Sequence, residues 1–528
     1  MSGDGQQPAV NVLFITVDQW RGDCLSALGH PLVQTPALDR LAAGGVLFRN
    51  HYANSAPCGP SRAGIHTGTY QFHHRSVQNG TPLDARFTTL PLEVRAAGRT
   101  PYLLGYTDTT MDPRVVPAAD PRLRTYETVM TGWDSPVGIT EHDPLWQRHL
   151  ARLGYELPED FWDLYAPLDV PGADRRGPTW APTVIPAEHS ETTFLTDTAI
   201  ELLDAIERPF FVHLSYLRPH PPYRAPAPYH DCYDPADVPA FTRHARREDE
   251  AAVHLFLQAV VGAEGIAAPA DERDARQLVA TYYGLMRLVD DNLGRLFDHL
   301  RDTGRWDDTV VIVTSDHGEQ ACDHWLIQKL GWFDQSYHVP LIVRDPRHPD
   351  QHGTVVDAFT EHVDLLPTLL ELVGTTDPPL QCDGRSLVPF LEGRTPPEWR
   401  THVFFEFDFR MPPTEAEGGG GSAEPVVPEV APGEPAGPLG MRTADCSLAV
   451  VRTAAWKYVH FPTLPPLLYD LTEDPGELVD RAADPGARDA MVELLRTMVT
   501  HRMRNDDRTL ANTLVTRHGA RSVDDRLR

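Results

Sequence analysis

The sequence predicts an α/β fold with a large, mostly parallel sheet that helices cover on both faces. Two observations lead to this prediction. Before position 400, apolar runs of strand length alternate with stretches whose apolar residues have helical spacing. The runs are apolar throughout, without regular polar alternation, and such strands are typical of parallel sheets buried on both faces.

The individual elements follow from these patterns. Six apolar runs are predicted strands of the sheet: residues 11–17, 45–49, 102–106, 210–216, 309–314 and 339–343. A predicted helix over residues 35–43 begins with Thr35 as its cap and Pro36 at its first position, where proline is favoured. A second predicted helix, over residues 275–303, carries apolar side chains at helical spacing.

The region after position 400 predicts a smaller α+β subdomain packed on the first. Its β-rich runs are short: residues 448–452, 457–461 and 467–471. A helix over residues 485–503 follows, with Asp484 as its cap and Pro485 at its first position.

Domain boundaries are predicted from composition. Residues 412–440 are rich in Gly, Pro, Ala and Glu without apolar periodicity, so we expect a disordered insert there, because burial cannot offset its ordering entropy. We therefore expect an α/β catalytic domain at 8–400, an α+β subdomain at 401–504 that contains the insert, and a C-terminal tail at 505–528.

Composition excludes some partners. The 528 residues include 47 Lys+Arg and 75 Asp+Glu, a formal net charge of −28, which argues against nucleic acid or an anionic membrane as a partner. The chain shows no signal-peptide pattern and no apolar run long enough to span a bilayer. Its six cysteines are scattered, with no short metal-binding spacing, so a reduced, cytoplasmic setting is expected.

Polar residues follow two of the predicted strands. Asp18 ends the first, and Asp316 and His317 end the fifth. Ligands of open α/β sheets bind beyond the carboxyl ends of strands, so two carboxylates and an imidazole at that edge predict one divalent metal. In the competing interpretation, Asp18 only caps the next helix and Asp316 only begins a turn.

A second signal is the segment CGPSRAGIHTG at residues 58–68. Pro60 suits the first position of a helix, which would leave Cys58 just outside a helix N-terminus, where anions are favoured. Arg62, about one turn along, could hold developing negative charge near position 58. A thiol nucleophile is another interpretation, and a buried, inert cysteine is a third.

These motifs resemble those of a known family. The pattern C-x-P-S-R followed by T-G is similar to the signature of type I sulfatases, in which the cysteine is oxidised to Cα-formylglycine. VDQ after the first strand, SDHGEQ after a late strand and LYDLTEDPGE near the end occur in the same order as in that family. The resemblance implies an alkaline-phosphatase-like fold.

The finer resemblance is to one subgroup. Ordinary arylsulfatases usually carry Asp-Asp and Asp-Asn where this chain has Asp18–Gln19 and Asp316–His317. The sequence here is closer to the phosphonate monoester hydrolases, which are promiscuous towards phosphodiesters and aryl sulfates. Choline sulfatases share both features but resemble this chain less around Asn79 and His220.

The resemblance implies a metal and a modified nucleophile. Asp18, Asp316, His317 and the oxygen of formylglycine at position 58 would bind one Mn²⁺ or Ca²⁺, with Gln19 as a further ligand or a donor behind the ligands. A hydroxyl of the hydrated formylglycine would attack phosphorus or sulfur, and the reaction would pass through a covalent intermediate on residue 58.

Other residues gain roles through the same resemblance. Arg62 would stabilise hydrated residue 58, Lys329 would neutralise substrate charge, and His220 would protonate the leaving group. Asn79, Tyr106 and Thr107 would contact substrate oxygens. The subgroup favours a hydroxyl residue where this chain has Asp108, an anion, so Thr107 or Thr109 would take its place.

We therefore expect a hydrolase of phosphonate monoesters, phosphodiesters and/or sulfate esters. One alternative is a dedicated sulfatase for a small or sugar sulfate ester, and another is a non-catalytic homologue that binds metal or anions. The expected partners are a small anionic ester, a formylglycine-generating enzyme during maturation and further copies of the chain, with a tetramer by analogy.

Overall fold

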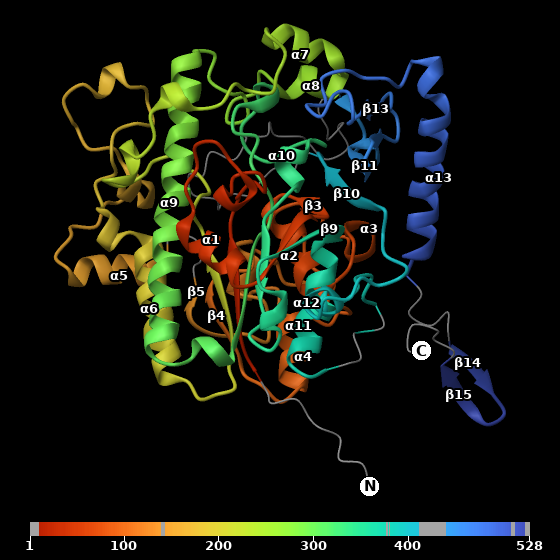
Figure 1. Ribbon diagram of the computed structural model, residues 1–528, viewed down its shortest axis with the longest axis horizontal. Coiled ribbons are helices and arrows are strands. Elements are labelled where there is room, and N and C mark those ends of the chain that lie inside the picture. Colours follow the sequence, from red (N-terminus) through yellow and green to blue (C-terminus); the bar gives the residue numbers. More distant parts are fainter. Residues whose placement is uncertain are drawn as a thin grey trace.

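A computed structural model describes residues 10–138, 143–375, 379, 381–410, 440–507 and 513–522 (Figure 1). The predicted insert at 412–440 lies outside the described residues except for Gly440. Of the predicted tail at 505–528, only residues 505–507 and 513–522 are described. The division of the chain into domains stays a prediction.

The main element is a mixed, mostly parallel sheet, as the apolar runs predicted, and it has eight strands. In spatial order its strands are β5 (Asp134–Gly138), β4 (Pro101–Gly105), β6 (Phe211–Tyr216), β1 (Asn11–Val17), β7 (Thr309–Ser315), β8 (Leu341–Arg344), β2 (Val46–Tyr52) and β9 (Thr354–Glu361). Only β8 is antiparallel to its neighbours, β7 and β2. The apolar runs did not predict β5 and β9, which have exposed or half-buried residues.

Helices cover both faces of this sheet (Figure 1). One face carries α1 (Pro36–Ala43), α6 (Glu191–Ala205) and α9 (Glu272–Asp302). The other carries α2 (Cys58–Thr67), α4 (Leu90–Ala96), α11 (Leu365–Leu372) and α12 (Val388–Leu391). Strand β1 is buried on both sides, because Leu13, Ile15 and Val17 face the first group and Val12 and Phe14 the second. Burying each large apolar side chain contributes about 1.5–3 kcal/mol.

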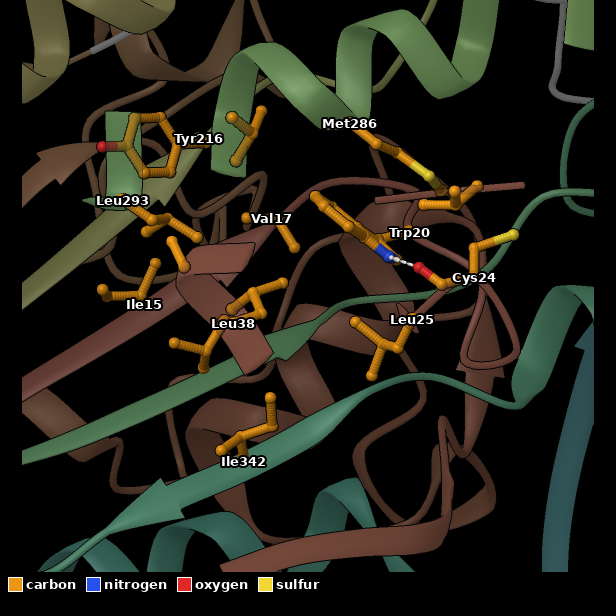
Figure 2. Packing of buried hydrophobic residues seen from close by; sticks show 14 of the residues in the cluster. Ile15, Val17, Trp20, Cys24, Leu25, Leu38, Tyr216, Met286, Leu293 and Ile342 are labelled. Atoms are coloured by element: carbon orange, nitrogen blue, oxygen red, sulfur yellow. Dashed lines mark hydrogen bonds between the residues drawn. The ribbon is translucent and has the colours of Figure 1, made fainter. Parts of the chain in front are cut away.

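The chain that leaves β1 is anchored by the core. Trp20 is fully buried among Met286, Leu25 and their neighbours, and its Nε1–H donates to the carbonyl of Cys24 at 3.0 Å (Figure 2). Because Trp20 follows Asp18 and Gln19 directly, this packing fixes the direction in which those two residues leave the sheet.

Two predicted helix starts differ from the structure. Thr35 precedes α1, but its side chain does not cap the helix; Asp290 of α9 accepts from the backbone N–H groups of Ala37 and Leu38, each at 2.9 Å. Helix α2 begins at Cys58, so Cys58 is its first residue and Pro60 its third. Proline is tolerated there because first-turn N–H groups lack helical partners.

A second sheet of five strands lies beside the first. Its order is β13 (Leu467–Asp470), β12 (Trp456–His460), β11 (Ser447–Thr453), β10 (His402–Asp408) and β3 (Ser55–Ala56). One face packs on aromatic residues of the main body, and the other packs on Leu494 and Met498 of α13 (Arg488–Arg504). The side chain of Asp484 accepts from the N–H of Gly486 at 2.8 Å, as expected of a cap.

The second sheet reaches the predicted nucleophile segment. Its parallel edge strand β3 comes from the N-terminal half of the chain and ends two residues before Cys58. The remaining elements are α3 (Gln71–His74), α5 (Pro144–Arg152), α7 (Arg247–Val253), α8 (Leu255–Val260), α10 (Asp334–Tyr337), β14 (Thr513–Thr516) and β15 (Gly519–Ser522). Among the described residues, no helix combines the length and apolarity that crossing a membrane requires.

Candidate active site

Strand pairing brings the two aspartates together. Strands β1 and β7 are parallel neighbours, and Val17 pairs with Ser315 at their carboxyl ends. The next residues, Asp18 and Asp316, therefore leave the sheet side by side. Both are fully buried, at 1% and 0% exposure.

Cys58 completes a compact group. Its Sγ lies 3.1 Å from Nε2 of His317 and 4.0 Å from Oδ1 of Asp18. One ligand atom from each of Asp18, Cys58, Asp316 and His317 lies within 4.8 Å of the others. The structure thus brings together the four residues proposed from sequence as metal ligands.

Backbone contacts orient His317. Its Nδ1 lies 3.0 Å from the carbonyl of Gly318, so Nδ1–H donates there and Nε2 keeps a lone pair towards Cys58. Gly318 is needed for this turn, because a Cβ at this position would lie 2.0 Å from the carbonyl oxygen of Gln335.

Arg62 lies behind the group and joins its carboxylates. Its Nε donates to Asp316 at 2.9 Å, and Nη2 donates to Asp18 at 3.1 Å. Nη1 donates to Ser215 Oγ at 2.8 Å and to the carbonyl of Tyr106 at 3.2 Å. The guanidinium is therefore a clamp on both aspartates, a role that the sequence had not suggested.

The surroundings shift the pKa values of Asp18 and Cys58 in opposite directions. Burial alone would raise the pKa of Asp18, but the neighbouring His317 ring and the charges of Arg62 and Lys329 hold it below its usual range. Burial, together with the negative charge of Asp18, raises the pKa of the Cys58 thiol well above its usual range. A reactive thiolate needs the opposite shift, so these surroundings oppose the thiol-enzyme interpretation.

The chemistry of the donors fits a divalent metal. Two carboxylates and one imidazole suit Mn²⁺, and carboxylates also suit Ca²⁺ and Mg²⁺. A thiolate would be a soft ligand among hard ones, whereas an oxygen at position 58 would match the two carboxylates.

Lys329, His220 and the side-chain amide of Gln19 lie together at one side of the four proposed metal ligands. Nζ of Lys329 donates to Oε1 of Gln19 at 2.9 Å and lies 3.3 Å from Nε2 of His220. Lys329 is 6% exposed, so its ammonium is largely removed from water. The structure therefore brings together Gln19, His220 and Lys329, three residues that were proposed from the sequence as site residues.

The state of His220 differs from that of a general acid. Burial and the Lys329 charge lower the pKa of His220 well below its usual range, which favours the neutral ring. Its Nδ1 lies 2.8 Å from the carbonyl of Pro221, which places the proton on Nδ1. Nε2 then accepts a hydrogen bond from Lys329 and has no proton of its own to donate.

Two of the predicted substrate-binding residues have other contacts in the structure. The hydroxyl of Tyr106 donates to Asp18 Oδ2 at 2.5 Å. Oδ1 of Asn79 accepts from the N–H of Gly59 at 2.8 Å, in the first turn of α2. Both side chains thereby position the residues around Cys58.

Thr107 and Asp108 have surroundings that the sequence did not indicate. The Thr107 hydroxyl donates to the carbonyl of Thr128 and accepts from the N–H of Met130, and its role in substrate binding stays a prediction. Thr109 donates to the carbonyl of Thr107. Burial raises the pKa of Asp108 well above its usual range, with Glu127 adding to the shift. These surroundings therefore favour the neutral acid at position 108 over the anion that the sequence suggested.

Sequence reasoning missed three further residues that support the site. Glu319 contacts Gln19, Ser61 Oγ donates to the carbonyl of Asp316 at 2.5 Å, and Ser215 accepts from Arg62. Glu319 lies in the SDHGEQ motif and Ser61 in the CGPSR motif, so their positions in these motifs could have indicated them. Nothing local marks Ser215, whose position at the end of β6 depends on the sheet order.

Comparison with known proteins identifies the family. The family model described as "Sulfatase" matches residues 10–375, and the chain belongs to this family.

Two relatives are similar over nearly the whole chain. The multifunctional alkaline phosphatase superfamily protein PehA of Trinickia caryophylli is 40% identical, over 95% of this chain and 97% of its own length. The crystal structure of a phosphonate monoester hydrolase from Agrobacterium radiobacter is 41% identical, with a TM-score of 0.88 over 98% of this chain and 100% of that one. An arylsulfatase of Clostridium perfringens is 27% identical over 76% of this chain and 82% of its length.

Proposed function

We propose that this protein is a metal- and formylglycine-dependent hydrolase of phosphonate monoesters and phosphodiesters that also accepts sulfate esters. The observation that carries the proposal is the convergence of Asp18, Cys58, Asp316 and His317 within 4.8 Å. The 41% identity to a phosphonate monoester hydrolase over 98% of this chain supports the substrate class.

In this proposal Asp18, Asp316, His317 and residue 58 hold one Mn²⁺ or Ca²⁺, and Gln19 is a neighbouring donor. The metal supplies Lewis acidity, and formylglycine at position 58 supplies a hydrated aldehyde as nucleophile. Arg62 holds both aspartates in place, because it donates a hydrogen bond to each of them.

Lys329 and His220 act on the substrate as a pair. The Lys329 ammonium neutralises a non-bridging oxygen or the departing oxygen, which stabilises charge that develops in the transition state. Because His220 Nε2 accepts from Lys329, we assign the donated proton to Lys329, with His220 holding the ammonium in position.

Two measurements test this function. Mass spectrometry of the peptide containing residue 58, after expression with a formylglycine-generating enzyme, is expected to show formylglycine. Kinetics with nitrophenyl phenylphosphonate and nitrophenyl sulfate are expected to favour the phosphonate. A preference for sulfate by orders of magnitude would instead identify a dedicated sulfatase, and unmodified Cys58 in an active enzyme would exclude the proposed nucleophile.

We also propose that the protein acts in the cytoplasm, where the formylglycine-generating enzyme of its host modifies Cys58. The supporting observation is the state of the other cysteines: Cys24, Cys322 and Cys446 are buried free thiols, and Cys232 is an exposed one. A set of free thiols is typical of a reducing compartment.

We propose further that the chain forms a homo-oligomer, with a tetramer as the expected state. The outer face of α13 exposes an apolar stripe made of Val492, Leu495, Val499 and Met503, at 37–65% exposure. The hairpin β14–β15 projects from the body and exposes Leu514 and Val515 (Figure 1). Light scattering on the parent and on Val499→Asp tests this, and a parent that is monomeric at micromolar concentration would contradict it.

A further inference from the structure

Glu319 is a buried carboxylate that the proposed chemistry does not use. It is 0% exposed and accepts hydrogen bonds from four donors. Oε1 accepts from the backbone N–H groups of Ala321 at 2.9 Å and Gln328 at 2.7 Å. Oε2 accepts from the hydroxyl of Tyr223 at 2.7 Å and from Nε2 of Gln19.

These contacts determine which way the amide of Gln19 points. A carboxylate accepts hydrogen bonds and an ammonium donates them. Because Nε2 of Gln19 faces Glu319, its Oε1 faces Lys329 and accepts from Nζ at 2.9 Å. Gln19 is itself in the left-handed region, with φ 70°, so its backbone is held in a conformation that non-glycine residues seldom adopt.

The loop that carries Lys329 needs similar support. Between Glu319 and Lys329, five non-glycine residues have positive φ: Ala321 (48°), Cys322 (72°), His324 (50°), Trp325 (60°) and Gln328 (72°). Such conformations cost energy and persist where surrounding contacts fix them. Glu319 supplies contacts near both ends of the loop, at Ala321 and Gln328.

We propose that Glu319 is a positioning residue that fixes the polarity of the Gln19 amide and thereby holds Lys329 beside His220 for reaction with the substrate. This inference rests on the proposed function, in which Lys329 contacts the substrate. In this proposal, the position of the Lys329 ammonium depends on the direction of the hydrogen bonds around Gln19 as well as on charge.

The substitution Glu319→Gln distinguishes a role in orienting the Gln19 amide from a role in which Glu319 only fills space. The new amide has nearly the same size, and its oxygen can keep the two backbone N–H groups as partners. Its NH₂ group would then face the NH₂ of Gln19, which places two donors together. Gln19 would have to turn its amide over and present NH₂ to the Lys329 ammonium, so Lys329 would lose the acceptor that Gln19 supplies.

The exchanged pair Gln19→Glu/Glu319→Gln restores the direction of both bonds. The new amide at position 319 would donate to the carboxylate at position 19, and the other oxygen of that carboxylate would accept from Lys329. The experiment measures kcat and KM for nitrophenyl phenylphosphonate on the metal-loaded parent, both single variants, the exchanged pair and Tyr223→Phe. Thermal unfolding of each protein reports on folding.

We expect Glu319→Gln to lower kcat/KM about 100-fold, mainly through kcat, because an electrostatic contact to the transition state is lost. The exchanged pair should recover at least about tenfold of this loss, although it differs from the parent at two positions. Tyr223→Phe removes one donor without reversing any polarity and should cost less than about fivefold.

Two outcomes would overturn the inference: a Glu319→Gln variant within about threefold of the parent, or an exchanged pair no faster than either folded single variant. If Glu319→Gln does not fold, Gln19→Glu can be compared with the exchanged pair instead. In Gln19→Glu the carboxylates at positions 19 and 319 face each other, and the exchanged pair removes this repulsion. A parent inactive on every ester would refute the proposed function itself, which keeps the two failures distinct.

Discussion

The two sides of the site are built in different ways. The side around Cys58 stands on the ends of β1 and β7 and on the first turn of α2, and Arg62 joins its two aspartates. The side around Lys329 stands on loops with several positive-φ residues, and side-chain hydrogen bonds hold it. Regular elements thus place the proposed nucleophile, whereas hydrogen-bond direction places the proposed cation.

This difference has a consequence for tolerance to change. Strand ends and helix starts are fixed by many backbone bonds and by the core, so the Cys58 side should keep its geometry when one contact is removed. A loop held by a few polar contacts depends more strongly on each of them, and most on contacts whose direction is reversed. The predictions below test each side in turn.

The largest effect is expected on the first side, from Cys58→Ala. Removing the proposed nucleophile should lower kcat/KM by about 10⁴- to 10⁶-fold, because nothing else in the site replaces it. Steady-state kinetics with nitrophenyl phenylphosphonate measure this, and Cys232→Ala is the matched control, since Cys232 is an exposed cysteine. Substantial activity in Cys58→Ala would show that the chemistry does not use this side.

A smaller loss is expected on the second side, from Lys329→Ala. Without the ammonium, charge that develops on the substrate is no longer neutralised, and kcat/KM should fall about 10²- to 10³-fold. Lys329→Arg keeps the charge but not the single-point contact to Gln19 Oε1, so it should recover only part of the activity. Equal activity in all three proteins would remove Lys329 from the proposed mechanism.

Asp108 gives a test that depends on pH. Its raised pKa means that the carboxyl is protonated below that pKa and becomes an anion as the pH rises through it. Any hydrogen bond that the neutral acid donates is therefore lost on the alkaline side. We expect Asp108→Asn, whose amide also donates, to retain activity within about tenfold and to lack part of the alkaline decline. A variant at least about 100-fold slower at every pH would show that an ionised Asp108 is needed.

The smallest effect is expected from Asn79→Ala. This change removes the acceptor for the N–H of Gly59 in the first turn of α2 and should cost about 1 kcal/mol of unfolding free energy. Activity should fall less than about tenfold, because the remaining backbone bonds of α2 still place Cys58. Urea unfolding together with kinetics measures both quantities. A loss as large as that of Lys329→Ala would mean that Asn79 contacts the substrate directly.

Much of this arrangement could be predicted from the sequence. The apolar runs at residues 11–17 and 309–314 correspond to β1 and β7, and the polar residues after them meet at one edge because parallel strands share that edge. The strands β3 and β5 were not predicted: β3 has two residues, and β5 is largely exposed, so neither carries a clear apolar pattern. The Thr35 cap was wrong because its competitor, Asp290, comes from a distant helix.

The sequence by itself determined the fold class and the residues that meet at Cys58, because strand periodicity, helix signals and the C-x-P-S-R motif are all local. Only the tertiary structure decided how those residues are used. Arg62 clamps two aspartates, His220 carries its proton away from Lys329, burial raises the pKa of Asp108, and Thr107 has backbone partners. Burial and hydrogen-bond direction depend on neighbours from remote parts of the chain, which no local pattern records.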